Sequence, residues 1–170
     1  EDINLRLSEL SKEFSQNLLD ATNSWEMIVK EEDVLEIGQS DKDLAKIEID
    51  GETKYKFTLQ MPSYIAYITY GNNREKRQEI YKEYSTRAPK NGKIIEEILI
   101  LKNEKVNILG FENYAQYSIT TKMASDEQSV IDFLYKLANS SKEGAFKEFN
   151  EVSAFAKTRD GLDDLQSYDL

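Results

Sequence analysis

The sequence predicts a mainly α-helical protein with one small β-strand or hairpin element around residues 46–60. Apolar residues recur every three or four positions through most of the 170 residues, which is the spacing of one helix face. Alternation of apolar and polar residues is confined to that one short stretch. Apolar residues make up 39% of the chain, which is enough for a core and argues against global disorder.

Residues 1–30 are expected to form one long helix. Its apolar stripe contains Ile3, Leu7, Leu10, Phe14, Leu18, Ala21, Trp25 and Ile28. Trp25 is predicted to anchor the core rather than to bind a ligand. The acidic run 31–33 is expected to be a solvated turn after the helix.

Residues 40–60 are expected to contain a short helix followed by the β-element. Ser40 is suited to cap the helix, and Asp41 and Asp43 favour its first turn. Segments 46–49 and 54–59 alternate on either side of an Asp-Gly pair at 50–51, which is typical of a tight hairpin turn.

Residues 63–124 are predicted to be a helical region. Tyr64, Tyr67 and Tyr70 are spaced to share one helix face, which we expect to be half-buried with the hydroxyl groups at its rim. A groove wall that meets a peptide is the functional alternative for this face. Asn72 or Asn73 is expected to cap the next helix.

Three further helices are expected in this region, over 74–88, 93–109 and 111–119. The helix over 93–109 is apolar around most of its surface, so it is predicted to lie near the centre of the core. Gly110 follows it, where a left-handed residue commonly ends a helix.

A long helix is predicted over 125–158, opened by a capping box of Ser125 and Gln128 and ended near Gly161. Residues 159–170 are expected to start the next element. The whole of 1–170 is predicted to be a single helical fragment of a larger protein. Position 1 is not a methionine, and residues 168–170 carry no stop signal. We therefore expect an excised piece of a longer chain.

Histidine and cysteine are both absent from the sequence. This excludes Ser-His-Asp triads, Cys-His pairs and ordinary zinc sites within these residues. The net charge of −10 argues against nucleic-acid and anionic-membrane partners, because both attract basic proteins. The lack of cysteine fits a reducing cytoplasm.

Several local patterns suggest candidate sites, but each is better explained by a structural role. Asp160, Asp163 and Asp164 surround a glycine, but their spacing does not match an EF-hand calcium loop. Asp41 and Asp43 are explained by helix capping. Asn139 begins a glycosylation sequon inside a predicted helix, so it is discounted.

The densest basic region contains Arg74, Lys76, Arg77, Lys82 and Arg87. Interleaved glutamates predict that ion pairs within one helix explain most of it.

Several stretches, taken in order, resemble the thimet-oligopeptidase family of zinc metallopeptidases, and within it the bacterial oligopeptidase A branch. They cover residues 10–19, 57–64, 73–88, 109–115 and 121–124. The resemblance extends over essentially the whole chain. The last residues, 167–170, resemble the start of a family element that usually carries Trp before the Asp, and Tyr168 departs from that pattern.

The resemblance implies a neurolysin-like architecture in which helical lobes flank a channel that admits short peptides. It also implies a zinc ion held by the histidines of an H-E-x-x-H helix and by a downstream glutamate. That motif would lie beyond Leu170 in a full-length relative. The resemblance therefore assigns no catalytic, cofactor-binding or metal residue to this sequence, and we expect these 170 residues alone to be inactive.

The expected function is that of a noncatalytic helical segment of a cytoplasmic, zinc-dependent endopeptidase of short peptides. Its partners would be short peptides and the remaining lobes of the same polypeptide. Two alternatives remain open from the sequence. One is a segment of a dipeptidyl carboxypeptidase of the same family, and the other is a stand-alone helical protein-interaction module.

Overall fold

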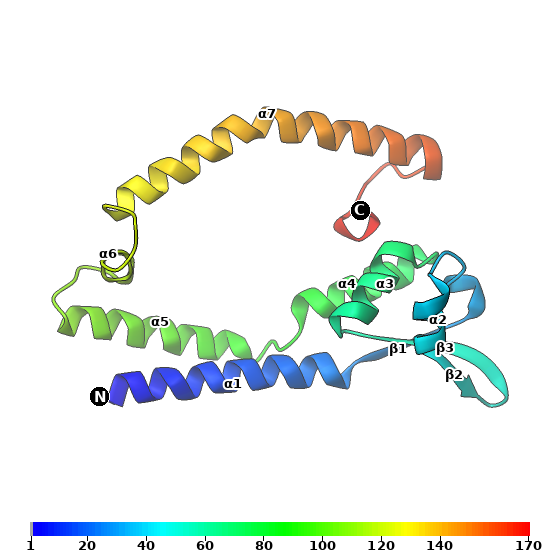
Figure 1. Ribbon diagram of the computed structural model, residues 1–170, viewed down its shortest axis with the longest axis horizontal. Coiled ribbons are helices and arrows are strands. Elements are labelled where there is room, and N and C mark those ends of the chain that lie inside the picture. The colour runs from blue at the N-terminus through cyan, green and yellow to red at the C-terminus, as the bar shows by residue number, and fades with distance from the viewer. Residues whose placement is uncertain (1) are drawn as a thin grey trace. The chain divides into compact units, whose positions relative to one another are not determined.

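The computed structural model describes residues 2–170, so position 1 of the predicted first helix lies outside the described residues. The chain divides into two compact units. The sheet unit comprises Ser8–Ile94 and Gln166–Leu170, and the long-helix unit comprises Ile95–Leu165 together with the described residues up to Leu7. Helices dominate both units and only a small sheet is present among the described residues, which confirms the predicted fold class (Figure 1).

The helices and strands follow one another in a simple order along the chain. They are α1 (Asp2–Ser24), β1 (Glu26–Val29), the 3₁₀ turn η1 (Glu31–Asp33), α2 (Gln39–Ala45), β2 (Lys46–Ile49), β3 (Glu52–Thr58), α3 (Met61–Tyr70), α4 (Arg74–Thr86), α5 (Asn91–Ile108), α6 (Tyr114–Ile119), α7 (Glu127–Asp160) and the 3₁₀ turn η2 (Ser167–Asp169).

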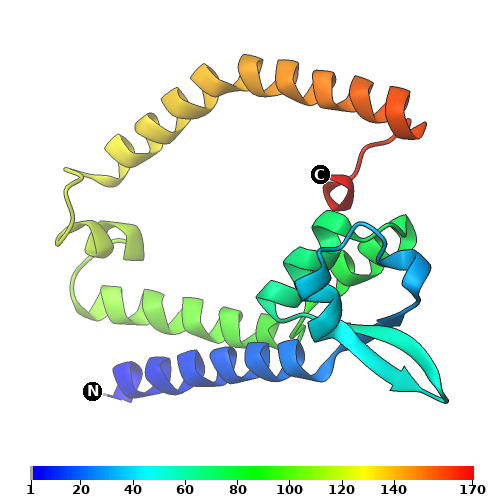
Figure 2. The same cartoon turned by 45° about the vertical axis from the view of Figure 1, so that its right-hand side comes forward.

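The sheet has three antiparallel strands in the order β1-β3-β2. Asp50 and Gly51 connect β2 to β3 with φ angles of 54° and 77°, as a two-residue hairpin requires. The predicted hairpin is therefore confirmed. Figure 2 shows it extending away from the helices of its own unit.

The prediction of a helix over 1–30 is wrong at its end, because α1 stops at Ser24 and residues 26–29 form β1. Met27 and Val29 are buried whereas Glu26 and Ile28 are exposed, which is the two-residue period of a strand. Ile28 fitted the helical spacing by coincidence. Pairing of β1 with β3, from Glu26 opposite Thr58 to Val29 opposite Tyr55, decides the conformation.

The core of the sheet unit lies where α3 and α4 pack beside β3. Phe57 from β3 and Tyr67 from α3 meet there with ring centroids 4.7 Å apart. Trp25 packs against this core while remaining partly exposed, in agreement with its predicted role. The buried members are Met27, Val29, Val34, Ile37, Ala45, Tyr55, Phe57, Leu59, Tyr64, Ala66, Tyr67 and Ile80.

Capping residues begin several helices, though not always the expected ones. Asn73 accepts hydrogen bonds from the N–H groups of Glu75 and Lys76, as predicted. Ser40 lies inside α2, which starts after Gly38 without a side-chain cap. The Ser125 capping box is also wrong, because Asp126 caps α7 by accepting from the N–H of Ser129 at 2.7 Å. Aspartate is as favourable as serine at the N-cap of a helix, so two adjacent residues, Ser125 and Asp126, were both suitable.

The long-helix unit is thinly packed. Arg6 and Glu97 form a two-point ion pair at 2.7 and 3.1 Å, and Val106 in the last turn of α5 is fully buried. The prediction that the helix over 93–109 lies near the centre of the core is wrong for these residues. Large apolar side chains of α5 remain exposed, among them Leu99 at 61% and Ile100 at 66%.

No helix among residues 2–170 combines the length and the apolar character needed to cross a membrane.

Gly71 ends α3 directly beside the ring of Tyr67. A Cβ at this position would lie 2.7 Å from Tyr67 Cε1 and 2.7 Å from the Tyr67 carbonyl oxygen, closer than real Cβ atoms approach. We expect Gly71→Ala to destabilise the chain by about 1–3 kcal/mol, because the fully buried ring has no room to move.

Urea unfolding checks this expectation, with Gly92→Ala as the control. Gly92 lies at the start of α5, and a Cβ added there would meet no atom within 4 Å, so alanine should leave stability unchanged or raise it. Equal midpoints for Gly71→Ala and the unmodified chain would contradict the steric argument.

Candidate functional site

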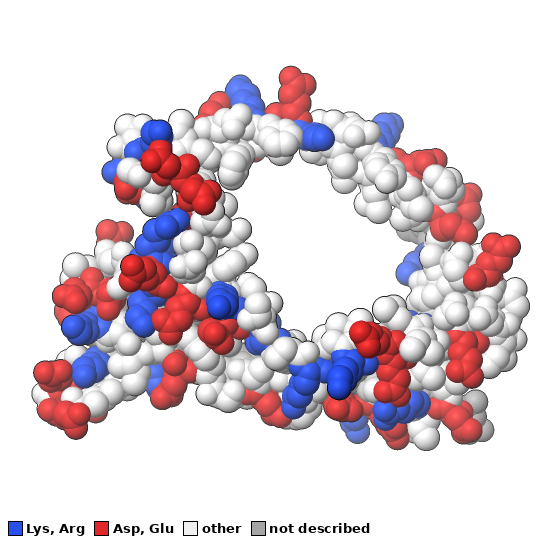
Figure 3. All heavy atoms as spheres, turned by 180° about the vertical axis from the view of Figure 1, so that it is seen from behind, with Lys and Arg blue, Asp and Glu red and all other residues white. Residues whose placement is uncertain are grey.

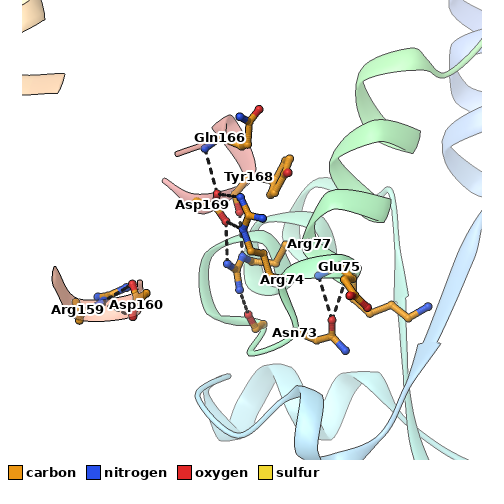
Figure 4. A network of polar contacts seen from close by, with 11 residues as sticks. Asn73, Arg74, Glu75, Arg77, Arg159, Asp160, Gln166, Tyr168 and Asp169 are labelled. Atoms are coloured by element: carbon orange, nitrogen blue, oxygen red, sulfur yellow. Dashed lines mark hydrogen bonds and ion pairs between the residues drawn. The ribbon is translucent and has the colours of Figure 1, made fainter. Parts of the chain in front are cut away.

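A polar cluster in the sheet unit joins α4 to the turn η2 near the end of the sequence. The side chain of Asp169 is only 1% exposed. It accepts hydrogen bonds from Arg74 Nε at 2.9 Å, Arg74 Nη2 at 2.7 Å and Arg77 Nη2 at 3.1 Å. Figure 4 shows the carboxylate of Asp169 facing both guanidinium groups.

The same arginines also hold backbone and ring atoms. Arg77 donates from Nε to the Tyr168 carbonyl at 2.9 Å and from Nη1 to the Gly71 carbonyl at 2.8 Å. The Arg74 guanidinium lies 5.1 Å from the centre of the buried Tyr168 ring. We call Arg74, Arg77, Tyr168 and Asp169 the anchor cluster, because together they fix η2 to α4.

The electrostatics of the anchor cluster indicate a structural ion-pair network that holds η2 on α4, and not an acid–base site. Burial alone would raise the pKa of Asp169, but hydrogen bonds from Arg74, from the Gln166 N–H and from Arg77 outweigh it and hold the pKa below its ordinary value of 3.8. The carboxylate is therefore ionised at neutral pH. Its acceptor positions face donors of its own chain, so we assign it no proton-transfer role.

The predicted tyrosine face is only partly as expected. Tyr64 and Tyr67 are buried, and Tyr70 is 51% exposed. Tyr64 stacks on Tyr84 with ring centroids 4.1 Å apart, and the Arg87 guanidinium lies 3.7 Å from the Tyr84 ring centre. These side chains serve the packing of α3 on α4, which disfavours the alternative of a peptide-facing wall.

The hydroxyl of Tyr67 is buried without a hydrogen-bond partner among the described residues. Burial raises the pKa of Tyr67 well above its ordinary value, so the hydroxyl stays protonated at physiological pH. It makes no hydrogen bond to a base among the described residues, so it gives no indication of catalysis.

A pocket of about 330 Å³ lies between α2, β3 and α3 within the sheet unit. Leu44, Phe57, Pro62 and Ala66 form much of its wall. Of its polar groups, Ser63 Oγ accepts the Thr58 N–H at 2.9 Å and Lys56 pairs with Glu26 at 3.4 Å. The pocket thus offers a largely apolar wall in which Ser63 and Lys56 already have partners, which is unlike a catalytic centre.

The acidic candidates are separated by the structure. Asp160 ends α7 and pairs with Arg159 at 2.6 Å, whereas Asp163 pairs with Lys157 at 2.7 Å. Asp41 and Asp43 remain on α2. Within residues 2–170, no three acidic side chains converge as a metal site would require. The absence of catalytic and metal residues from this chain remains a prediction.

The prediction that ion pairs within one helix explain most of the basic region is wrong for Arg74 and Arg77. Lys76 pairs with Glu79 on the same helix at 2.7 Å, as predicted. Arg74 and Arg77 instead reach Asp169, more than ninety positions away, which the sequence analysis missed. The two arginines are three apart, so they share a helix face, but nothing local indicates their partner. Asn139 lies within α7, where the sequon was discounted.

Comparison with known proteins identifies the family. The family model for "Peptidase family M3" matches residues 67–170, which is more than half of the chain. The chain belongs to peptidase family M3. The predicted resemblance to the thimet-oligopeptidase family is thereby confirmed.

The M3 chain is 42% identical to oligopeptidase A of Escherichia coli (strain K12) across 99% of its own length. It is 33% identical to a probable cytosolic oligopeptidase A of Arabidopsis thaliana, again over 99%. Identity to the dipeptidyl carboxypeptidase of E. coli (strain K12) is 22% over 98%. The M3 chain spans about a quarter of the length of these relatives, 27%, 26% and 26% respectively.

Proposed function

We propose that this chain is a noncatalytic helical segment of a metalloendopeptidase that hydrolyses short peptides in the cytoplasm. The observation that carries the proposal is the 42% identity to an oligopeptidase A, sustained over 99% of the chain. The parent would be the enzyme. This segment would contribute architecture, as the anchor cluster does by fixing the chain where η2 returns to α4.

Zinc is the metal that the family resemblance implies for the parent. The donor set of these residues does not fit it, because the sequence has neither histidine nor cysteine and no three acidic side chains converge within residues 2–170. We therefore place the zinc site in residues of the parent that this chain lacks. Short peptides and the other lobes of the same polypeptide are the proposed partners.

The runner-up is a segment of a dipeptidyl carboxypeptidase. Its support is a 22% identity that also spans nearly the whole chain. The difference between 42% and 22% over the same residues favours the endopeptidase. A stand-alone interaction module is the weakest interpretation, because the family match takes in both α4 and α7.

Assay of the full-length parent against peptides blocked at both termini tests the proposal. We expect internal cleavage, because an endopeptidase does not need a free terminus, and we expect the 170-residue chain alone to be inactive. The same peptides with a free C-terminus are the control. Release of C-terminal dipeptides from the free peptide, with no cleavage of the blocked one, would establish the runner-up instead.

A further inference from the structure

An apolar stripe runs along α7 in the long-helix unit, and most of it is exposed. The stripe consists of Val130, Leu134, Leu137, Ala145, Phe149, Val152 and Ala156. Ala156 at the end of the stripe is already buried, but Leu134 and Leu137 are each 54% exposed and Phe149 is 50% exposed. A helix of 34 residues with such a stripe normally buries it against a neighbour. Helices in folded proteins gain most of their stability from this packing, because an isolated helix is only marginally stable in water.

The middle of α7 carries small residues on the same side. Ser141 continues the stripe between Leu137 and Ala145, and Gly144 lies seven positions after Leu137. A Cβ added at Gly144 would meet no atom within 4 Å. Glycine inside a helix is unfavourable relative to alanine, and nothing in the described residues requires it here. Close approach of a second backbone would supply the missing reason.

The spacing of the stripe indicates what kind of partner fits. Steps of three and four residues form the ridges into which the side chains of another helix pack, and small residues at the centre allow the two axes to approach closely. An anionic membrane surface is disfavoured, because α7 carries five basic and six acidic side chains. Figure 3 shows charges of both signs mixed along the upper edge of this helix, beside uncoloured residues.

We propose that the stripe of α7 is the docking face for a helix of the parent polypeptide that this chain lacks, with Gly144 at the closest contact. The oligopeptidase A relatives are nearly four times as long as the segment they share with this chain, which leaves ample polypeptide for that partner. The inference rests on the existence of a longer parent and not on its peptidase activity. Loss of cleavage in an assay would therefore leave it standing.

Cysteine labelling of the full-length parent tests the docking face. Ser141→Cys is nearly isosteric and lies on the stripe, whereas Asn139→Cys lies on the opposite side of α7, and both positions are exposed in the present chain. N-ethylmaleimide is the probe, and mass spectrometry of the α7 peptide excludes signal from cysteines elsewhere in the parent. We expect the thiol of the Ser141→Cys variant to react at least about tenfold more slowly than that of the control in the native parent.

The 170-residue chain is the control, because both introduced thiols should react with N-ethylmaleimide equally fast there. Equal rates in the parent would overturn the inference. Protection of the Ser141→Cys variant in the 170-residue chain would also overturn it. Dependence of that protection on concentration would show a second copy on the stripe, and independence would show the sheet unit there.

Gly144→Ala provides a second test, in which the melting temperature should change in opposite directions in the 170-residue chain and in the full-length parent. In the 170-residue chain it should raise the melting temperature, because alanine favours the helix and meets no atom. In the parent it should lower the melting temperature or prevent folding, because the methyl group would displace the partner helix. A rise in both contexts would contradict close packing at this glycine.

Discussion

Replacement of Phe57 by alanine is expected to unfold most of the sheet unit under conditions that leave the unmodified chain folded. Phe57 is 1% exposed and lies at the centre of the core, against the fully buried Tyr67. Removal of a buried phenyl ring costs about 3–5 kcal/mol through lost transfer energy and the remaining cavity. That is a large share of the total stability of an ordinary domain.

Urea unfolding followed by the fluorescence of Trp25 measures the effect, since this only tryptophan of the sequence packs against the core of the sheet unit. Phe133→Ala is the matched control. Phe133 lies on α7 and is 63% exposed, so the same chemical change should alter stability by less than about 0.5 kcal/mol. Similar midpoints for the two variants would show that the sheet unit does not form the core described here.

Asp169→Asn is the second large expected effect. The substitution keeps the size of the side chain but removes the charge that two guanidinium groups surround. Loss of one partner of a buried ion pair costs about 3–5 kcal/mol when both partners are buried. Arg77 is 17% exposed and Arg74 is 41% exposed, so solvent screens part of the loss and we expect about 2–3 kcal/mol.

Asp163→Asn serves as the control for that variant. Asp163 pairs with Lys157 at 2.7 Å, but the two side chains are 79% and 69% exposed. Exposed pairs contribute little, and we expect a change below about 1 kcal/mol. If the two asparagine variants were equally stable, the anchor cluster would have no role in holding η2.

The anchor cluster also predicts how stability depends on pH. The pKa of Asp169 is lowered in the folded chain relative to its ordinary value of 3.8. The folded state therefore holds fewer protons than the unfolded state between these two pKa values, and stability rises with pH there. The contribution should be fully present above the ordinary pKa of 3.8 and should disappear as the pH falls through the lowered pKa of the folded state.

Unfolding midpoints measured from pH 7 down to strongly acidic solution check this behaviour against the Asp169→Asn variant. The difference in unfolding midpoint between the unmodified chain and the Asp169→Asn variant should become smaller as the carboxyl group of Asp169 becomes protonated. A difference that stays constant across this range would assign the effect of the substitution to shape and not to charge.

Much of the fold was predictable because its signals are local. The Asp-Gly pair at 50–51 indicated the hairpin, and Asn73 indicated the start of α4. The errors arose where two local patterns coincided. Ile28 satisfied helical and strand spacing alike, and Ser125 and Asp126 were both suitable caps. Pairing with β3 settled the first case, and hydrogen-bond geometry settled the second.

The candidate site could not be predicted in the same way. The sequence placed Arg74 and Arg77 on one helix face, but their partner Asp169 lies more than ninety residues further along the chain. Tyr168 likewise showed only as a departure from a family pattern, whereas the structure buries it beside Tyr81, with ring centroids 6.0 Å apart. No local rule selects one carboxylate among 32 acidic residues for such a contact.

By itself the sequence determined that the chain is mainly helical, that it lacks histidine and cysteine, and that its resemblance is to the thimet-oligopeptidase family. These properties depend on residue identity and on neighbours a few positions apart. Only the tertiary structure decided that residues 26–29 join the sheet, that η2 closes the sheet unit through Asp169, and that α7 leaves most of its stripe exposed. Each of these depends on which distant segments come into contact. Burial and ion pairing arise from those contacts, so the residues of one segment alone do not determine them.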